Sequence, residues 1–225
     1  MISAELPWVT LEGISGVGKT HLARNVSAIL GADCALLAEL PDSAAGTLPA
    51  AVIAALPGNG DLFLRTGTPL TETVLLSALH VHRWESMAAP ARARLVLEDR
   101  GPYSVAAYQG AIISAGSSDS SEALMAGLRI LALITQWRPL PAMTVLLRDD
   151  PARCVRRFEQ RIGRPATGSE CQLMTRVGDL YLQLAAAAQP DRLTVIDRTG
   201  LSEQQATDLV LDACTRAARS RPAGG

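Results

Sequence analysis

Short apolar runs alternate with longer amphipathic stretches along the chain, and this alternation predicts its secondary structure. Five apolar runs predict strands, at residues 8–11, 35–39, 94–98, 143–147 and 193–197. The stretches between and after them predict helices, at residues 21–30, 48–56, 68–89, 103–115, 121–137, from 151 onward, 170–188 and from 203 onward. Such an alternation favours a parallel sheet with helices on both faces.

The longest of the early helices has a clear predicted start. Thr68 and Pro69 are the residue types preferred at the N-cap and the first helical position. Pro90 marks its end. Its expected apolar face is incomplete and consists of Leu70, Val74, Leu79 and Val81. The residues from 202 to 205, Ser-Glu-Gln-Gln, form a capping box at the start of the last helix.

Other segments are less regular. Residues 41–60 are rich in Pro, Gly, Ala and Ser and are the least predictable part of the fold, apart from the short helix within them. Residues 163–169 are expected to form a mobile loop. No repeat or domain boundary is evident, so we predict one domain, residues 1–218, followed by a flexible tail, residues 219–225.

Composition narrows the class of protein. The 225 residues are 48% hydrophobic and 19% charged, which is typical of a globular domain. A formal net charge of −1 argues against nucleic acid or a membrane surface as a partner. The four cysteines stand far apart, without a Cys-x-x-Cys pair, which favours reduced thiols. No signal peptide or membrane-spanning run is evident, so a cytoplasmic protein is expected.

Residues 13–20, Gly-Ile-Ser-Gly-Val-Gly-Lys-Thr, match the phosphate-binding P-loop pattern Gly-x-x-x-x-Gly-Lys-[Ser/Thr] between a predicted strand and a predicted helix. The glycines let backbone N–H groups surround a polyphosphate at the positive end of the helix. Lys19 can reach the β- and γ-phosphates, and Thr20 can hold Mg²⁺. We therefore predict a nucleotide and Mg²⁺ as cofactors. The residues expected to bind the nucleotide are Gly13, Ser15, Gly16, Val17, Gly18, Lys19, Thr20 and His21.

A second chemical signal follows the strand at residues 94–98. P-loop enzymes need an acidic residue at the end of a neighbouring strand to hold Mg²⁺ or its water beside the P-loop threonine. Asp99 fits this need and is predicted, with Thr20, as a metal-binding residue. Arg100 can bind a phosphate through two parallel hydrogen bonds.

The segment that begins with Asp99 also resembles a known family. Residues 99–110, Asp-Arg-Gly-Pro-Tyr-Ser-Val-Ala-Ala-Tyr-Gln-Gly, are similar to the Asp-Arg-x-x-x-Ser-x-x-Ala-Tyr-Gln-Gly segment of thymidylate kinases. Residues 11–13, 67–72 and 83–85 resemble that family's Phe-Glu-Gly, Gly-Thr-Pro-Leu-Gly-Glu and Arg-Trp-Glu. The likeness covers nearly the whole chain except residues 39–64. It implies an α/β fold, a P-loop NTPase three-layer α/β/α sandwich with a five-stranded parallel sheet and an arginine-rich lid at about residues 157–170.

The resemblance also implies roles for individual residues. The acceptor nucleotide is expected between the long helix and the strand that ends at Asp99, with its phosphate held by Arg83 and Arg100. The acceptor-binding residues implied are Glu12, Arg65, Leu79, Arg83, Arg100, Ser104, Tyr108 and Gln109. The residues expected to support phosphoryl transfer are Lys19, Asp99, Arg100, Arg157 and Arg161.

Family members neutralise the γ-phosphate with a basic residue in the P-loop or with arginines from the lid. This P-loop has no basic residue before Lys19, so the lid is expected to supply the charge. In a helical lid stem, Arg153, Arg157, Arg161 and Arg164 share one face. Arg157 and Arg161, and also Arg164, are predicted to reach the phosphates when the lid closes.

Three positions depart from the family pattern. Ser15 stands where the family usually has aspartate, and Leu79 stands where it usually has a phenylalanine that stacks on the pyrimidine. Arg65 is the only candidate for the arginine of the family's Arg-Glu-Pro-Gly-Gly-Thr-Pro, at a spacing shifted by two. His80 and His82 lie close to Leu79 in sequence and could compensate for the lost aromatic face, but surface positions are expected for both.

These observations leave three hypotheses. The first is a nucleoside monophosphate kinase that transfers phosphate from ATP to a dTMP-like acceptor, as a homodimer by resemblance. The second is a kinase of a nucleoside or small metabolite on the same scaffold, with Glu39 as the carboxylate base. The third is a nucleotide-binding regulator without catalysis, against which the presence of Lys19, Thr20 and Asp99 counts.

Overall fold

The computed structural model describes residues 6–39, 46–56, 61–88, 90–117, 119–188 and 192–219. A sheet of five parallel strands forms its centre, in the order β2-β3-β1-β4-β5. The strands are β1 (Trp8–Glu12), β2 (Cys34–Leu37), β3 (Leu95–Asp99), β4 (Met143–Arg148) and β5 (Leu193–Asp197). The predicted five-stranded parallel sheet is confirmed.

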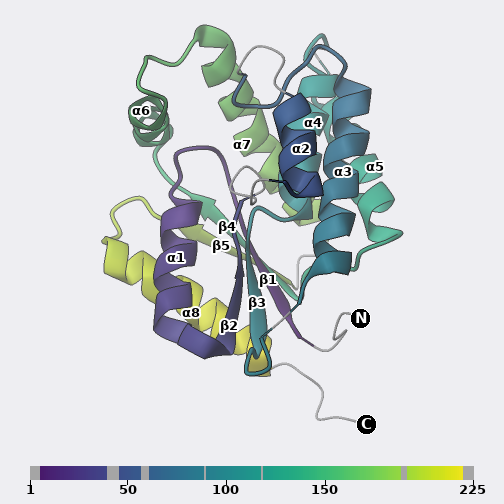
Figure 1. Ribbon diagram of the computed structural model, residues 1–225. Coiled ribbons are helices and arrows are strands. Elements are labelled where there is room, and N and C mark those ends of the chain that lie inside the picture. The colour runs from purple at the N-terminus through teal and green to yellow at the C-terminus, as the bar shows by residue number, and fades with distance from the viewer. Residues whose placement is uncertain are drawn as a thin grey trace.

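Helices cover both faces of this sheet (Figure 1). On one face lie α1 (Lys19–Leu30) and α8 (Glu203–Arg219). On the other lie α3 (Pro69–Ser86), α4 (Pro102–Ile113), α5 (Ser120–Thr135) and α7 (Gly168–Ala188). The short α2 (Leu48–Ala55) lies beside α3, and α6 (Pro151–Ile162) stands beyond the end of β4. The predicted three layers are therefore present.

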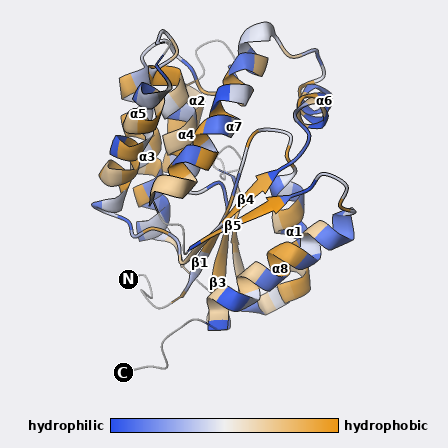
Figure 2. Cartoon of the chain, turned by 180° about the vertical axis from the view of Figure 1, so that it is seen from behind, coloured by the Kyte–Doolittle hydropathy of each residue, from blue (hydrophilic) through white to orange (hydrophobic). Residues whose placement is uncertain are grey.

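The inner strands are buried on both faces. All five residues of β1 and all five of β3 are buried, and Val9, Leu11, Val96 and Leu97 have no exposed surface. Strands covered on two sides become continuous apolar runs, which is why they were visible in the sequence. Figure 2 shows this as hydrophobic strands between helices of mixed colour, with α6 mostly hydrophilic.

Local hydrogen bonds define several helix starts. Asp150 precedes α6, and its carboxylate accepts a hydrogen bond from the Arg153 backbone N–H at 2.8 Å. The capping box before α8 is confirmed: the Ser202 N–H donates to Gln205 Oε1 at 2.8 Å, and the Gln205 N–H donates to Ser202 Oγ at 3.2 Å.

The long helix α3 begins as predicted, with Thr68 at the N-cap position and Pro69 as its first residue, but it ends early. It ends at Ser86, three residues earlier than expected. Thr68 precedes its first residue, but the Thr68 side chain makes no capping hydrogen bond. The Glu72 carboxylate instead accepts hydrogen bonds from two backbone N–H groups that precede the helix, those of Thr66 at 2.6 Å and of Thr68 at 3.1 Å.

The predicted apolar face of α3 is right at Leu79, which is buried, but wrong at Leu70 and Val74. Leu70 and Val74 are 68% and 58% exposed. The buried face of the helix is largely polar and consists of Glu72, Thr73, Leu76, Ser77, Leu79, His80 and Arg83. His80 was expected at the surface and is only 2% exposed. A helix that buries polar residues requires polar partners, and these lie at the site described below.

Two features of the chain remain. In the described ranges, none of the helices is both long and apolar enough to span a membrane. The predicted tail begins at residue 219, but α8 includes Arg219, and residues 220–225 lie outside the described part of the chain.

Candidate active site

The P-loop connects β1 to α1 at the carboxyl end of the sheet. Gly13, Gly16 and Gly18 adopt φ values of +136°, +79° and +94°, which L side chains rarely adopt. A Cβ added at Gly16 would lie 2.0 Å from the carbonyl oxygen of Cys154. The loop is therefore seated against the first turn of α6, and it requires glycine for both conformation and space.

Lys19 lies inside the loop and is 4% exposed. Its Nζ donates hydrogen bonds to the carbonyl oxygens of Gly13 at 2.8 Å and Ile14 at 2.9 Å. Burial, together with the nearby Arg100 guanidinium, lowers the pKa of Lys19 to about 7. The ammonium group thus occupies the centre of the loop, where it can exchange these carbonyl oxygens for phosphate oxygens.

Asp99 ends β3 next to Thr20 at the start of α1. It is 1% exposed, and neither carboxylate oxygen has a well-aligned hydrogen-bond partner among the described residues. Burial raises the pKa of Asp99, while Lys19 and the Thr20 hydroxyl lower it. An unsatisfied carboxylate beside a hydroxyl suits Mg²⁺, which takes few protein ligands and completes its shell with water and phosphates. The described residues contain no cluster of three or more His, Cys, Asp or Glu side chains that could hold a metal without such a substrate.

Three polar residues meet at the entrance to the P-loop. The Tyr108 hydroxyl accepts a hydrogen bond from the Ser15 N–H at 2.9 Å and lies 3.1 Å from Ser15 Oγ. Arg100 Nη2 donates to Ser15 Oγ at 3.3 Å, and the Arg100 guanidinium lies 5.4 Å from the centre of the Tyr108 ring. Arg100 also forms an ion pair with Glu39, which follows β2.

These residues border a cavity of about 110 Å³, which we call the acceptor cavity. Five predicted site residues line it: Ser15, Arg100, Ser104, Tyr108 and Arg161. Its other lining residues are Glu39, Leu62, Phe63, Leu64, Leu76, His80 and Val105. One part of the wall is charged and the rest is apolar or aromatic, which suits a ligand with a polar group and a ring.

Glu12 lies behind this cavity and is fully buried. Its carboxylate accepts hydrogen bonds from the Gly101 N–H at 3.0 Å, from Ser104 Oγ at 2.5 Å and from the Tyr181 hydroxyl at 3.3 Å. Burial raises the pKa of Glu12 to about 7. Glu12 is absent from the lining of the cavity, and its contacts hold the start of α4 against β1.

Four more predicted acceptor residues also lie outside the lining of the cavity. Arg65 binds Asp61, with its Nε 2.8 Å from Asp61 Oδ2. Gln109 accepts a hydrogen bond from Thr73 at 3.1 Å. Leu79 is 2% exposed. The fourth residue, Arg83, has a separate role.

Arg83 belongs to a buried cluster between α3 and β3. Its Nη2 donates to the Ala38 carbonyl oxygen, and its Nη1 lies 3.6 Å from Glu98 Oε1. Glu98 forms two hydrogen bonds with Arg138, at 2.5 and 3.1 Å, and neither side chain is exposed. Burial alone would raise the pKa of Glu98, but Arg138 and Arg83 lower it, so its carboxylate is charged. In this structure Arg83 holds the segment that carries Glu39.

The arginines of the predicted lid have different partners. Arg153 and Arg157 bind Asp149, at 3.3 and 2.8 Å. Arg164 forms two hydrogen bonds with Glu170, at 2.9 and 2.7 Å. Arg161 is the member of this set that faces the acceptor cavity, with its guanidinium 5.6 Å from the Phe158 ring centre. The predicted loop begins at Gly163, and α7 starts at Gly168.

His21, predicted to bind ATP, is exposed and pairs with Glu203 of α8. Arg198 is a residue that the sequence did not reveal. Its Nη1 donates to the Val17 carbonyl oxygen, and a Cβ at Gly18 would lie 2.1 Å from that nitrogen. Arg198 therefore braces the end of the P-loop from the segment that follows β5.

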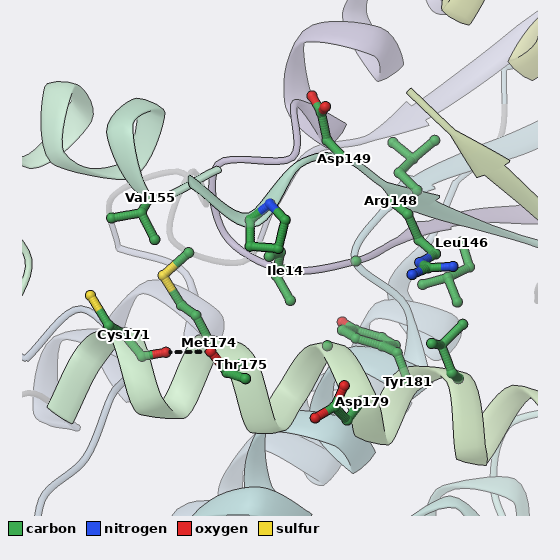
Figure 3. Close-up of a pocket in the computed structure, with 15 residues that line it drawn as sticks. Ile14, Leu146, Arg148, Asp149, Val155, Cys171, Met174, Thr175, Asp179 and Tyr181 are labelled. Carbon is green, nitrogen blue, oxygen red and sulfur yellow. Dashed lines mark hydrogen bonds between the residues drawn. The ribbon is translucent and has the colours of Figure 1, made fainter. Parts of the chain in front are cut away.

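A second cavity, of about 220 Å³, lies on the other side of the P-loop (Figure 3). Ile14 projects from the loop toward α7, where Met174 and Tyr181 face it. Arg148 and Asp149 from the end of β4 complete the wall. This cavity separates the loop from α7 and is mainly apolar.

Three functional candidates could not be assigned from the sequence. Phe63 comes from the segment without any family likeness, and its ring stacks on Tyr108 and on Phe158, with centres 5.8 and 5.5 Å apart. It supplies an aromatic wall to the cavity, whose lining does not include Leu79. For His80, the sequence offered only its closeness to Leu79 and the expectation of a surface position. For Arg198, the sequence offered no signal.

Comparison with known proteins agrees with the fold. No protein-family model matches this chain, and no curated protein matches it in sequence. The solved structure of thymidylate kinase from Candida albicans is similar, with a TM-score of 0.67 over 96% of this chain and 95% of that chain. The two sequences are 18% identical. The chain therefore has a P-loop NTPase-like α/β fold of the kind found in that kinase.

Proposed function

We propose that this protein transfers a phosphoryl group from ATP to a nucleoside monophosphate with a dTMP-like structure and so produces the diphosphate. The observation that carries the proposal is the convergence of Lys19, Asp99, Arg100 and Arg161 on one end of the sheet. Two arginines and a lysine there neutralise phosphate charge, and phosphoryl transfer depends mainly on positioning and such neutralisation. The structural similarity to a thymidylate kinase supports the same class of reaction.

The P-loop is the proposed ATP site. The N–H groups of residues 13–21 bind the phosphates, and Lys19 moves from the carbonyl oxygens of Gly13 and Ile14 to the β- and γ-phosphates. Thr20 and Asp99 hold Mg²⁺, which neutralises charge on the phosphates and orients them. Arg157 and Arg164 join the phosphates only after leaving Asp149 and Glu170.

The acceptor cavity is the proposed acceptor site. Arg100 and Arg161 hold the acceptor phosphate, Ser15 and Tyr108 contact the sugar, and Phe63 supplies an aromatic surface for the ring. The resemblance implies acceptor contacts for four further residues, Arg65, Leu79, Arg83 and Gln109. In this proposal, they contact the acceptor only after the cleft rearranges as it closes.

One observation favours a second candidate, the kinase of a nucleoside or other hydroxyl acceptor. The Glu39 carboxylate lines the acceptor cavity beside Arg100 and is 21% exposed. Burial alone would raise the pKa of Glu39, but Arg100, Lys19 and Arg161 lower it. A charged carboxylate at this place can accept the proton of an attacking hydroxyl, whereas a monophosphate acceptor needs no base there.

Replacing Glu39 by glutamine separates the two candidates. With a monophosphate acceptor, Glu39→Gln removes a negative charge beside the acceptor phosphate, so the acceptor KM stays the same or falls. With a hydroxyl acceptor, loss of the base lowers kcat by about 10²–10⁴. The assay measures ADP release with dTMP and with thymidine, and Lys19→Ala is the control that removes turnover in either case. Turnover by Lys19→Ala equal to that of the wild type would contradict the proposal.

The assembly and location complete the proposal. We propose a homodimer, supported by the exposed Leu70 and Val74 on the outer side of α3, and a cytoplasmic location. Light scattering of the purified protein tests the dimer directly. Replacement of both residues by glutamate disrupts the dimer if this face forms the contact, and leaves it intact if another face does.

A further inference from the structure

His80 is a buried polar residue in the acceptor cavity to which no role has been assigned. It lies on α3, one turn after Leu76, and both residues line the cavity. Its side chain is 2% exposed. One edge of the imidazole ring, carrying Nδ1, faces the buried cluster of Glu98 and Arg138. The other edge, carrying Nε2, has no hydrogen-bond partner among the described residues.

The cluster determines which ring nitrogen carries the proton. Arg138 Nη1 lies 3.4 Å from His80 Nδ1, and a guanidinium group can only donate hydrogen bonds. Glu98 Oε1 lies 3.9 Å from Nδ1, which is beyond hydrogen-bond distance. Nδ1 is therefore the acceptor, and the proton of the neutral ring is on Nε2.

His80 also stays neutral at working pH. Burial lowers the pKa of His80 to about 3, with Arg138 and Arg83 adding to the effect and Glu98 opposing it. These are the charged groups that face the ring from β3, from α3 and from the segment after α5. A protonated ring would place a third cation in a cluster that holds one carboxylate.

We propose that His80 is a specificity-determining residue, whose Nε2–H donates a hydrogen bond to an uncharged, lone-pair-bearing atom of the acceptor, such as a ring carbonyl oxygen. This inference rests on the proposed function, because it needs an acceptor in this cavity. A buried donor that lines the cavity discriminates strongly, since an acceptor without the matching atom leaves the N–H unpaired. The acceptor class is thus a planar ring with a hydrogen-bond-accepting edge.

Two conservative variants distinguish this role from a structural one. The amide nitrogen of glutamine can take the place of Nε2, and the amide of asparagine can take the place of Nδ1. If His80 serves the acceptor, His80→Gln stays near the wild type, and His80→Asn raises the acceptor KM about tenfold. If His80 only supports Arg138, the order is reversed. The KM for ATP stays unchanged in both variants, because the P-loop is intact.

The assay uses dTMP as the acceptor, or thymidine where dTMP is not phosphorylated. Wild-type turnover with an unchanged acceptor KM in both variants would overturn this inference alone. Failure of the wild type with both acceptors would overturn the proposed function, and the inference with it. Thermal unfolding of each variant verifies that the fold is retained.

An acceptor-independent measurement tests the same tautomer. The chain has three histidines, so ¹⁵N-histidine labelling gives three imidazole spectra, and His80→Gln identifies the signal of His80. We expect a neutral ring protonated on Nε2 at pH 6. A ring protonated on Nδ1, or on both nitrogens, would overturn the inference.

Discussion

Replacing Gly16 by alanine tests how the P-loop is seated against α6. Gly16 has a φ of +79°, and an added Cβ would lie 2.0 Å from the Cys154 carbonyl oxygen and 2.9 Å from the carbonyl carbon. Real Cβ atoms essentially never approach closer than 3.0 Å, so the new methyl group must retreat by about 1 Å. Both contacting atoms belong to the backbone of a helix and cannot rotate away.

Two effects add to the expected loss of stability. A left-handed backbone conformation costs an alanine about 1–2 kcal/mol relative to glycine. Overpacking against fixed backbone costs about 1–3 kcal/mol more. Gly200 provides a matched control, because it has the same φ of +79° but no atom within 4 Å of an added Cβ. Gly200→Ala therefore shows the first effect alone, and Gly16→Ala shows both.

The assay is urea unfolding of the wild type and both variants without nucleotide. We expect Gly16→Ala to lose at least about 1 kcal/mol more free energy of unfolding than Gly200→Ala. Calorimetric titration should also show a weaker MgATP affinity for Gly16→Ala, because the loop N–H groups move with the backbone. Equal losses of stability in the two variants would refute the contact between the P-loop and α6.

Three further predictions concern charged residues. The affinity for MgATP should fall about tenfold between pH 6 and pH 8, because Lys19 loses its proton above a pKa of about 7 and bound phosphates require it protonated. Lys19→Arg should bind MgATP with little pH dependence. An affinity of the wild type that does not change with pH would contradict the role of Lys19 in phosphate binding. Glu98→Gln should lower the free energy of unfolding by about 3–5 kcal/mol, because Arg138 then stays buried without the carboxylate that pairs with it. A loss below about 1 kcal/mol, measured by urea unfolding, would count against this role of Glu98. Arg161→Ala should raise the acceptor KM about 10- to 100-fold. Arg156 is an exposed residue on the same helix, and Arg156→Ala should leave the acceptor KM unchanged. Similar effects of the two variants would contradict a contact between Arg161 and the acceptor.

The P-loop and the position of Asp99 beside it could be predicted from the sequence because their determinants are local. The strand, the glycines and the lysine of the P-loop follow one another within thirteen residues, from Trp8 to Thr20. Asp99 was placed by a second local pattern, the end of an apolar strand. Each of these elements needs only its neighbours in sequence to adopt its conformation, so pattern and structure agree.

The cavity beside the P-loop and the polar face of α3 depend on contacts between distant segments. Arg83 binds Ala38 and Glu98, and Glu98 also binds Arg138, which lies far along the chain. The polar face of α3 could not be recognised as buried until those partners were known. Phe63 belongs to a segment with no periodic pattern, and its position between two aromatic rings is a property of the folded molecule.

The most direct test of the proposed function is the reaction itself. Purified protein is incubated with MgATP and dTMP, with thymidine, or without an acceptor, and the products are separated and identified. We expect ADP and dTDP to form in equal amounts with dTMP, and little ADP without an acceptor. Thymidine monophosphate formed from thymidine would instead establish the hydroxyl-acceptor candidate. ADP formation that no acceptor increases, or no ADP formation at all, would contradict the proposed function.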